Sequence, residues 1–363
     1  MKTQKTTTAP NTGLILAIDL GKYKSVACVY DRSTAQADFD TLPTSRAELL
    51  RLIDRHRPAL VVIEACALAG WVHDLCDERG LVCKVANTAS EAWKFKHTKR
   101  KTDKDDALRL AQLEALGQLP TVVIPPQQTR QWRGLIAYRQ VLVGRRVAGQ
   151  NRIRALLVGQ GLPAPRGHRA WTEIGLQGIG QHSKPLVDCD ADELWRGLLE
   201  LALTEYRQVR ELIEQAEAKL DALAKADAGV QILETIPGVG TRTAEAVVAH
   251  LHQPERFDTG KQVSAYVGLV PRQFQSGETD RRGRITRRGP AILRKLLVEC
   301  AWVMLRYNCW AREVYLRLSR GKARKKQAIV ALARKLLVRC WAMLRDKSPW
   351  RAEAQPQAEA APA

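Results

Sequence analysis

The chain has 363 residues, 45% of them hydrophobic and 26% charged, with a formal net charge of +20 at pH 7. That size allows two or three globular domains, and the charge favours a polyanionic partner, either nucleic acid or an acidic membrane surface. No apolar run is long enough to span a bilayer, and no signal segment opens the chain. The eight cysteines form no CxxC pair, so they fit buried thiols in a cytoplasmic protein better than a zinc site.

The first predicted domain covers residues 13–124 and follows a polar leader, 1–12, that we expect to be disordered. An apolar run at 14–19 ends in Asp19 and is followed by a β-rich run, which predicts two strands joined by a tight turn. The elements expected after the first strand are a strand at 25–30, a helix at 45–56, a strand at 59–63 ending at Glu64, a helix at 67–78 and a strand at 81–86. This order predicts an α/β sheet covered by helices.

A basic loop and a short helix complete the first domain. The loop is expected at 87–102 and carries Lys94, Lys96, Lys99, Arg100 and Lys101, which are candidate phosphate contacts. The helix is predicted to begin at Asp103 and to run to about Leu116, with Thr102 in position to cap its free amides.

Two long helices are predicted next, at 127–160 and 192–227, in a region that we bound at 125–228. Leucines recur in the second helix at near-heptad spacing, as in Leu194, Leu198 and Leu201, which predicts a helical hairpin or coiled coil. A dimerisation arm and an ordinary bundle core explain this pattern equally well.

The last predicted domain, 229–346, is mainly helical with one irregular segment at 270–290, and a disordered Ala/Pro/Glu-rich tail is expected at 347–363. Between Arg281 and Asp346 the chain has 19 Lys and Arg residues against three acids. A solvated surface does not need so large an excess, so it indicates phosphate contact.

Four acids of the first domain are candidate metal ligands. Asp19 and Glu64 each end an apolar strand, so both emerge at one sheet edge if the strands are neighbours. Asp103 and Asp106 are three residues apart and share a helix face. Converging carboxylates without His or Cys suit Mg²⁺ or Mn²⁺, and two such ions about 4 Å apart stabilise the attacking and leaving oxygens of a phosphodiester. Each acid alone also has an ordinary structural explanation.

Residues 236–252 have the pattern hydrophobic-Pro-Gly-hydrophobic-Gly before an Ala-rich helix, which is typical of a helix-hairpin-helix. Gly238 and Gly240 would let the backbone approach a phosphate near the free amides of the helix. A plain glycine turn between two helices is the alternative.

A third candidate site surrounds Ser276, which we expect in a flexible loop beside Gly277. A serine hydroxyl is a useful nucleophile when it is deprotonated or when the phosphate that it attacks is polarised. The arginines available to clamp that phosphate are Arg281, Arg282, Arg284, Arg287 and Arg288, and Arg272 is a further candidate nucleic-acid contact. By itself a Ser-Gly pair is usually a turn.

Together these patterns resemble the DEDD-type insertion-sequence transposases, relatives of the Piv DNA invertase and now known as bridge-RNA-guided recombinases. The matching acids are Asp19, Glu64, Asp103 and Asp106, in Ala-Ile-Asp-Leu-Gly, Val-Ile-Glu-Ala and Lys-Thr-Asp-Lys-Asp-Asp-Ala. The Pro-Gly-hydrophobic-Gly turn, the stretch from Ala265 to Arg272, and the Ser-Gly pair match the family's C-terminal domain. The resemblance covers roughly residues 14–345.

The resemblance implies a RuvC/ribonuclease-H-like N-terminal domain, a coiled-coil linker, and a mainly helical C-terminal domain with a helix-hairpin-helix. It implies that Ser276 forms a covalent phosphoserine with DNA, assisted by carboxylate-bound Mg²⁺, and that a structured guide RNA pairs with donor and target DNA. It also implies a tetramer built from dimers, with serine and carboxylates contributed by different protomers.

Two other functions fit part of the sequence. A metal-dependent, structure-specific nuclease of the junction-resolvase kind would use the carboxylates and the basic surface, but would leave Ser276 idle. A non-enzymatic nucleic-acid-binding protein would use the helix-hairpin-helix, but would leave the four acids unexplained.

Overall fold

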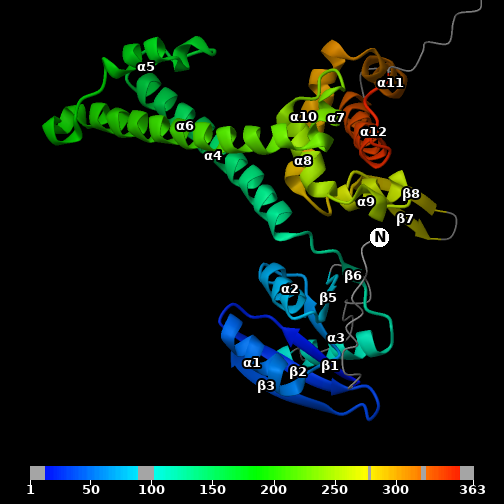
Figure 1. Cartoon of the computed structure of the whole chain (residues 1–363). Helices are drawn as coiled ribbons and strands as arrows, with labels where there is room; N and C mark the ends of the chain where they lie inside the picture. Colours follow the sequence, from blue (N-terminus) through cyan, green and yellow to red (C-terminus); the bar gives the residue numbers. More distant parts are fainter. Residues whose placement is uncertain (1–12, 89–101, 277–278, 320–323, 352–363) are drawn as a thin grey trace, which may run out of the picture. The chain divides into compact units, whose positions relative to one another are not determined.

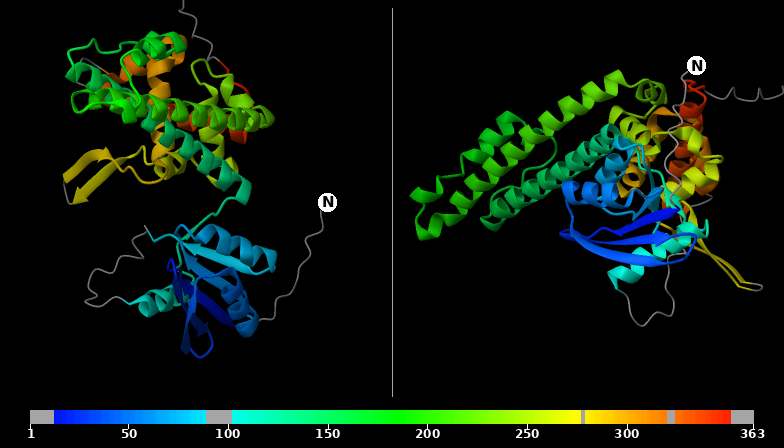
Figure 2. Two further views of the ribbon diagram at one scale, coloured as in Figure 1. Left: turned by 90° about the vertical axis from the view of Figure 1, so that its left-hand side faces the viewer. Right: turned by 60° about the horizontal axis from the view of Figure 1, so that its bottom comes forward.

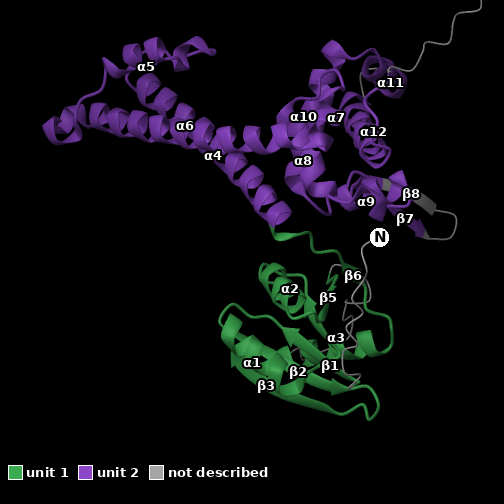
Figure 3. Ribbon diagram, in the orientation of Figure 1, with its two compact units in different colours: residues 1–127 green, residues 128–363 purple. Residues whose placement is uncertain are grey.

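The computed structural model describes residues 13–88, 102–276, 279–319 and 324–351. The chain divides into two compact units, residues 1–127 and 128–363 (Figure 3). The predicted leader, the basic residues from Lys94 to Lys101 and most of the predicted tail lie outside the described residues. Over the part that is described, no helix has the length and apolarity that crossing a membrane requires.

Unit 1 is built on a six-stranded mixed sheet (Figure 1). Its strands are β1 (Leu14–Asp19), β2 (Lys24–Asp31), β3 (Ala37–Pro43), β4 (Leu60–Glu64), β5 (Val82–Ala86) and β6 (Thr121–Val122), in the order β3-β2-β1-β4-β5-β6. The first three strands are antiparallel neighbours, whereas β1, β4 and β5 run parallel. Strands β3 and β6 were not predicted, because β3 is a largely polar edge strand and β6 has only two residues.

Helices cover both faces of this sheet. Side chains alternate along a strand, so Leu16 and Ile18 of β1 face α1 (Arg46–His56) and α2 (Ala69–Glu78). Ile15 and Ala17 face the other way and pack with α3 (Asp103–Ala115). Strand β4 follows the same rule, because its even-numbered residues pack with α3 and its odd-numbered residues with α1 and α2. Two apolar layers therefore sandwich the sheet.

Unit 2 begins with a long helical hairpin made by α4 (Gln127–Gly159) and α6 (Leu194–Ala226), as the sequence predicts. Leu199, Tyr206, Ile213 and Leu220 follow one another at seven-residue intervals on α6, and all four are buried. Tyr206 packs with residues of α4 such as Ile153, and Ile213 packs with Leu142. Figure 2 shows the two helices lying side by side.

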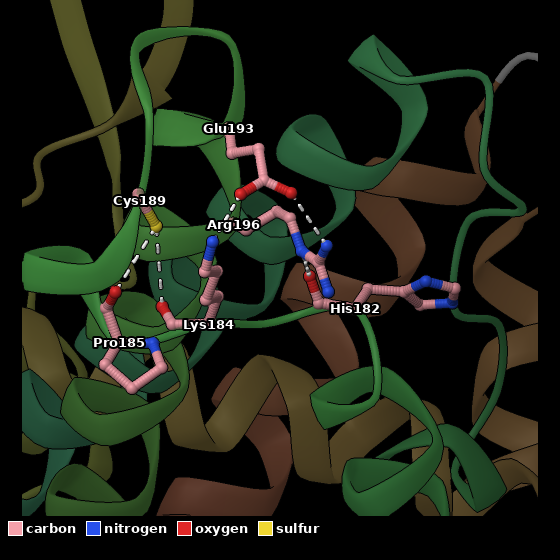
Figure 4. Close-up of polar contacts among 6 residues, drawn as sticks. All are labelled: His182, Lys184, Pro185, Cys189, Glu193 and Arg196. Carbon is pink, nitrogen blue, oxygen red and sulfur yellow. Dashed lines mark hydrogen bonds and ion pairs between the residues drawn. The ribbon is translucent and has the colours of Figure 1, made fainter.

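The connection between these helices contains α5 (Glu173–Gly180) and is tied to the start of α6. The carboxylate of Glu193 accepts hydrogen bonds from Lys184 Nζ at 2.5 Å and Arg196 Nη1 at 3.1 Å (Figure 4). Arg196 Nε also donates to the carbonyl of His182 at 3.1 Å, and Cys189 Sγ donates to the carbonyl of Pro185 at 3.3 Å. These contacts explain why a glycine- and proline-bearing link has an ordered path.

The rest of unit 2 is a helical cluster around one large apolar core. Its helices are α7 (Ala228–Glu234), α8 (Thr241–Leu251), α9 (Gly260–Val267), α10 (Ala291–Tyr307), α11 (Cys309–Ser319) and α12 (Lys325–Arg345). Their contacts centre on α12, which packs against α7, α8, α9, α10 and α11. The mixed sheet of unit 1 and the mainly helical unit 2 confirm the predicted order of an α/β domain followed by a mainly helical region.

One expectation for this region was wrong. The segment predicted to be irregular, 270–290, contains a β-hairpin of β7 (Pro271–Ser276) and β8 (Thr279–Ile285). Its sequence gave no strand signal because it is mostly polar, and its one aromatic residue, Phe274, is 60% exposed. Apart from the partly buried Ile285, the side chains that the structure describes on the hairpin are exposed, so the hairpin lacks the alternation of apolar residues that reveals a strand.

Candidate active site

Two of the predicted metal ligands end neighbouring parallel strands. Asp19 is the last residue of β1 and Glu64 the last residue of β4. Ile18 pairs with Ile63, so each acid directly follows a paired residue. By the alternation within these strands, both acids belong to the sheet face that α3 covers. Both are partly buried, which places two carboxylates on one face at one edge of the sheet.

The other two predicted ligands lie in the first turn of α3. Asp103 and Asp106 continue the stripe of Ala107 and Leu110, which packs against the sheet. Asp106 is partly buried and Asp103 is exposed. Asp105, on another side of the helix, is exposed as expected. Consecutive residues of a helix point in different directions, so Asp106 turns toward the sheet while Asp105 turns to solvent.

A capping box fixes where α3 begins. The side chain of Thr102 accepts a hydrogen bond from the Asp105 amide at 3.3 Å, and the Asp105 carboxylate accepts one from the Thr102 amide at 3.1 Å. This confirms the predicted cap. Asp105 therefore stabilises the helix start from outside the stripe that carries Asp103 and Asp106.

These elements bring oxygen donors alone toward one region of unit 1, a donor set that suits a hard divalent cation. Within the described ranges, no three His, Cys, Asp or Glu side chains are close enough together to form a ready-made metal site. The sheet face supplies Asp19 and Glu64, and the first turn of α3 supplies Asp103 and Asp106.

Ser276 occupies a different place from the one expected. It is the last residue of β7 and pairs with Thr279, so its backbone belongs to a hairpin and not to a loop. The side chains of 276, 279, 280 and 282 lie outside what the structure describes. Arg272, Arg281 and Arg284 on the same hairpin are exposed. The exposed guanidinium groups of this hairpin are accessible to a polyanion.

The base of this hairpin is held by hydrogen bonds that sequence reasoning missed. Arg294 of α10 donates through Nη1 to the carbonyls of Val267, Arg288 and Gly289, at 3.0, 2.7 and 2.9 Å. Nothing in the sequence separates Arg294 from the other basic residues of this region. It fixes the segment that carries Arg287 and Arg288, both of which are exposed.

The predicted Pro-Gly-Val-Gly turn joins α7 to α8. Gly238 has φ +91°, and a Cβ there would lie 3.0 Å from the Cα of Met304, so this glycine lets α10 pack closely. Gly240 precedes the first residue of α8, and a Cβ there would meet nothing within 4 Å. Gly238 is therefore needed for packing against α10 even if the turn contacts no phosphate. The space beside Gly240 is unoccupied, so a phosphate could approach its backbone.

Helix α8 contains two buried ionisable side chains that the sequence did not reveal. Burial raises the pKa of Glu245 to about 7, although Arg242 lies 3.1 Å away and favours the charged form. Burial, together with the nearby Arg133, lowers the pKa of His250 to about 4. Both residues follow the Pro-Gly-Val-Gly turn and belong to the interior of unit 2.

Two family models match the chain. One, a transposase model of the DEDD, IS110 type, matches residues 16–160, which include all four acids. The other, described as "Transposase IS116/IS110/IS902 family", matches residues 230–316, which include Ser276 and the Pro-Gly-Val-Gly turn. The two matches fall in the two regions that carry the candidate sites.

Similarity to individual proteins spans most of the chain. A putative transposase, y4rJ, of Sinorhizobium fredii is 30% identical over 319 residues, which cover 79% of this chain and 77% of the relative. The transposase for insertion sequence element IS1111A of Coxiella burnetii is 28% identical over 347 residues, which cover 93% of this chain and 91% of that transposase. A pilin gene-inverting protein of Moraxella bovis is 33% identical over 122 residues, which cover 33% of this chain and 38% of that protein.

Proposed function

Because this chain belongs to the IS116/IS110/IS902 family of insertion-sequence transposases, we propose that it recombines DNA through a covalent phosphoserine at Ser276. In this proposal Asp19, Glu64, Asp103 and Asp106 hold Mg²⁺ or Mn²⁺. The observation that carries it is the strand alternation of unit 1, which directs the acids of β1 and β4 toward the face that α3 covers.

The carboxylates have a simple physical reason to take up metal. Negative charges gathered at one sheet edge repel one another, and a divalent cation relieves that repulsion. When bound, the cation would stabilise negative charge on the oxygens of the phosphate undergoing substitution. The protein contributes rigid positions for the carboxylates, two at strand ends and two in a capped helical turn.

The proposed cleavage step balances as a substitution at phosphorus. Ser276 Oγ forms a bond to phosphorus, and the bond from phosphorus to the deoxyribose oxygen on one side breaks. The serine hydroxyl loses its proton, and the departing oxygen takes one up. Joining is the reverse reaction, in which a deoxyribose hydroxyl of another strand attacks the phosphoserine and releases the serine.

Guidance by a structured RNA is the proposed source of sequence choice, on the strength of the family resemblance and the net charge of +20. The protein would then contact backbone phosphates of RNA, donor DNA and target DNA. The proposed nucleic-acid contacts are Lys94, Lys96, Lys99, Arg100, Lys101, Gly238, Gly240, Arg272, Arg281, Arg282, Arg284, Arg287 and Arg288.

A second copy of the chain is the proposed partner of α6. Leu194, Leu198 and Leu201 are 48%, 50% and 53% exposed and recur at intervals of four and three residues, while Leu199 and Leu203 on the other face are fully buried. An exposed apolar seam with this spacing suits a coiled-coil contact between protomers. Dimers formed there would pair into the tetramer that the resemblance implies.

Sedimentation analysis of a Leu198→Lys variant tests the seam. A charge in an apolar seam is expected to shift the protein toward monomer, while Leu316→Lys, at a 69% exposed position of α11, should leave the assembly unchanged. An unchanged oligomeric state in the Leu198→Lys protein would show that the exposed leucines of α6 do not join two protomers.

The central experiment traps the protein on DNA. Wild-type protein with Mg²⁺, a nicked DNA substrate and its RNA is denatured, and mass spectrometry maps any residue bonded to DNA. Ser276→Ala should lose the adduct and all recombination while still assembling on nucleic acid, and Ser276→Cys should keep a trace because a thiolate is also nucleophilic. Ser264→Ala is the control, because Ser264 is buried in α9 and donates to the carbonyl of Gly260 at 2.7 Å.

The same experiment distinguishes the nuclease alternative. Cleavage by the Ser276→Ala protein, or an adduct on another residue, would contradict the phosphoserine mechanism. Cleavage without an adduct would then identify a metal-dependent, junction-resolvase-like nuclease.

A further inference from the structure

A basic cavity of about 790 Å³ opens within unit 2, and its lining includes neither the four candidate ligands nor residues of the β7–β8 hairpin. Its walls are the start of α9, one side of α11 and one side of α12. The lining residues are Thr259, Gly260, Lys261, Trp310, Val314, Arg317, Leu318, Ala331, Arg334, Lys335, Val338 and Arg339. A concave site of this volume is in the range that accepts a small molecule or a single nucleotide.

The charge of the lining has one sign. Five of its residues are Lys or Arg, and no Asp or Glu is among them. Lys261, Arg317 and Lys335 are exposed, so their charges reach the mouth of the cavity, whereas Arg334 and Arg339 are partly buried. So many cations facing one space repel one another, and an anion placed among them removes that cost.

Part of this cationic wall is held in place by aromatic rings. The guanidinium of Arg339 lies 4.8 Å from the ring centre of Trp310 and 5.0 Å from that of Trp350. The two indoles contact each other edge to face, with centroids 5.6 Å apart. Stacking of this kind orients a guanidinium, and it puts an indole and the Arg339 side chain into the lining of the same cavity.

We infer that this cavity binds one unpaired nucleotide of a DNA or RNA strand, with the phosphate among the cations and the base against Trp310 and its apolar neighbours. A duplex offers only its outer backbone to a concave pocket, whereas an unstacked nucleotide presents both a phosphate and a flat apolar base. The inference rests on the proposed function only in taking nucleic acid as the partner.

Binding of the full-length protein to fluorescent oligonucleotides tests the inference without any catalytic step. The probes are a twelve-nucleotide oligo(dT), an oligo(U) of equal length and a blunt DNA duplex. Arg317→Gln with Lys335→Gln removes two cavity cations, and Arg312→Gln with Lys326→Gln removes two exposed cations of the same helices outside the cavity. Ala331→Leu fills the cavity without changing the charge.

The cavity double variant should lower the slope of log affinity against log salt for single strands by about 0.7, because the single phosphate held in the cavity contributes about 0.7. Ala331→Leu should weaken single-strand binding about tenfold through lost base stacking, and should leave duplex binding unchanged. The ratio of dT to U affinities shows which strand the cavity prefers. A 5-iodouracil oligonucleotide photo-crosslinked to the wild-type protein should attach at or beside Trp310.

Equal effects of the two double variants, or equal losses for single strand and duplex, would overturn the inference in favour of a diffuse basic surface. A crosslink elsewhere, with normal binding by Ala331→Leu, would do the same. Neither result bears on the phosphoserine, which is tested by the trapped adduct.

Discussion

The four acids show how ordinary residues become a candidate site through their neighbours. Asp19 before a glycine turn and Asp103 at a helix start are each common structural features. Their significance comes from register, because β1 and β4 end together and alternation turns both terminal acids to the α3 side. Sequence reasoning reached this juxtaposition by treating each strand end as a position in a sheet.

We expect both the stability and the activity of the protein to depend on a divalent metal ion. Mg²⁺ should raise the melting temperature of the wild-type protein, because a ligand that binds only the folded state stabilises it. Asp19→Asn and Glu64→Gln should abolish that shift and strand exchange, while RNA binding is retained. Differential scanning fluorimetry with and without EDTA gives the shift, and a strand-exchange assay gives the activity.

Asp105→Asn is the matched control for these variants. It removes the same charge two residues from Asp103 but keeps an oxygen that can accept the capping hydrogen bonds of Thr102. It should retain both activity and the Mg²⁺ shift. Equal loss in Asp105→Asn would show that the acids act through general charge and not as ligands.

At the scale of elements, α8 carries two ionisable groups with opposite effects on stability. Glu245 keeps its proton up to about pH 7, whereas the unfolded chain releases that proton near pH 4.5. His250 stays neutral down to about pH 4, whereas the unfolded chain gains that proton near pH 6.5. Rising pH therefore destabilises the fold through Glu245 and stabilises it through His250, and the two effects oppose each other between about pH 4.5 and 6.5.

Single variants should expose each effect. Relative to wild type, Glu245→Gln should gain stability as pH rises from 4.5 to 7, by on the order of 2 kcal/mol. His250→Gln should gain stability relative to wild type as pH falls from 6.5 to 4. Urea unfolding at a series of pH values measures both trends. Glu299→Gln, at a position with a 59% exposed side chain, should show neither.

Elements were predictable where burial imposes a period on the sequence. Strands β1, β2, β4 and β5 and the helices α4 and α6 carry apolar patterns, and these elements lie close to their predicted bounds. The described side chains of the β7–β8 hairpin are almost all exposed, so no apolar alternation revealed its strands, and Ser276 was expected in a loop. The burial of Glu245 and His250 depends on packing between α8 and distant helices, which local sequence does not encode.

For the whole molecule, the excess of positive charge is the dominant feature. It amounts to +20 over the full sequence. Exposed arginines on β7 and β8 and at the foot of the hairpin bring part of that charge beside Ser276. Composition alone predicted a polyanionic partner, but the cavity of α9, α11 and α12 needed the folded arrangement, because its residues come from three separate segments.

Affinity for RNA and DNA should therefore depend steeply on salt. If six or more phosphates are contacted, binding should fall on the order of 10³-fold between about 50 and 200 mM salt, because each contact releases counterions. Filter binding or anisotropy over this range measures the slope. An affinity that changes little with salt would show that hydrophobic or base-specific contacts dominate.

The separate cores of the two units have a consequence for damaged copies of the gene. The apolar clusters around the mixed sheet contain only residues before 128, and the large helical core contains only residues after it. A gene copy interrupted between the two would therefore encode the unit that carries the four candidate ligands without the unit that carries Ser276. On the proposed mechanism, such a product would keep the metal ligands but lack the nucleophile, so it would not exchange strands by itself.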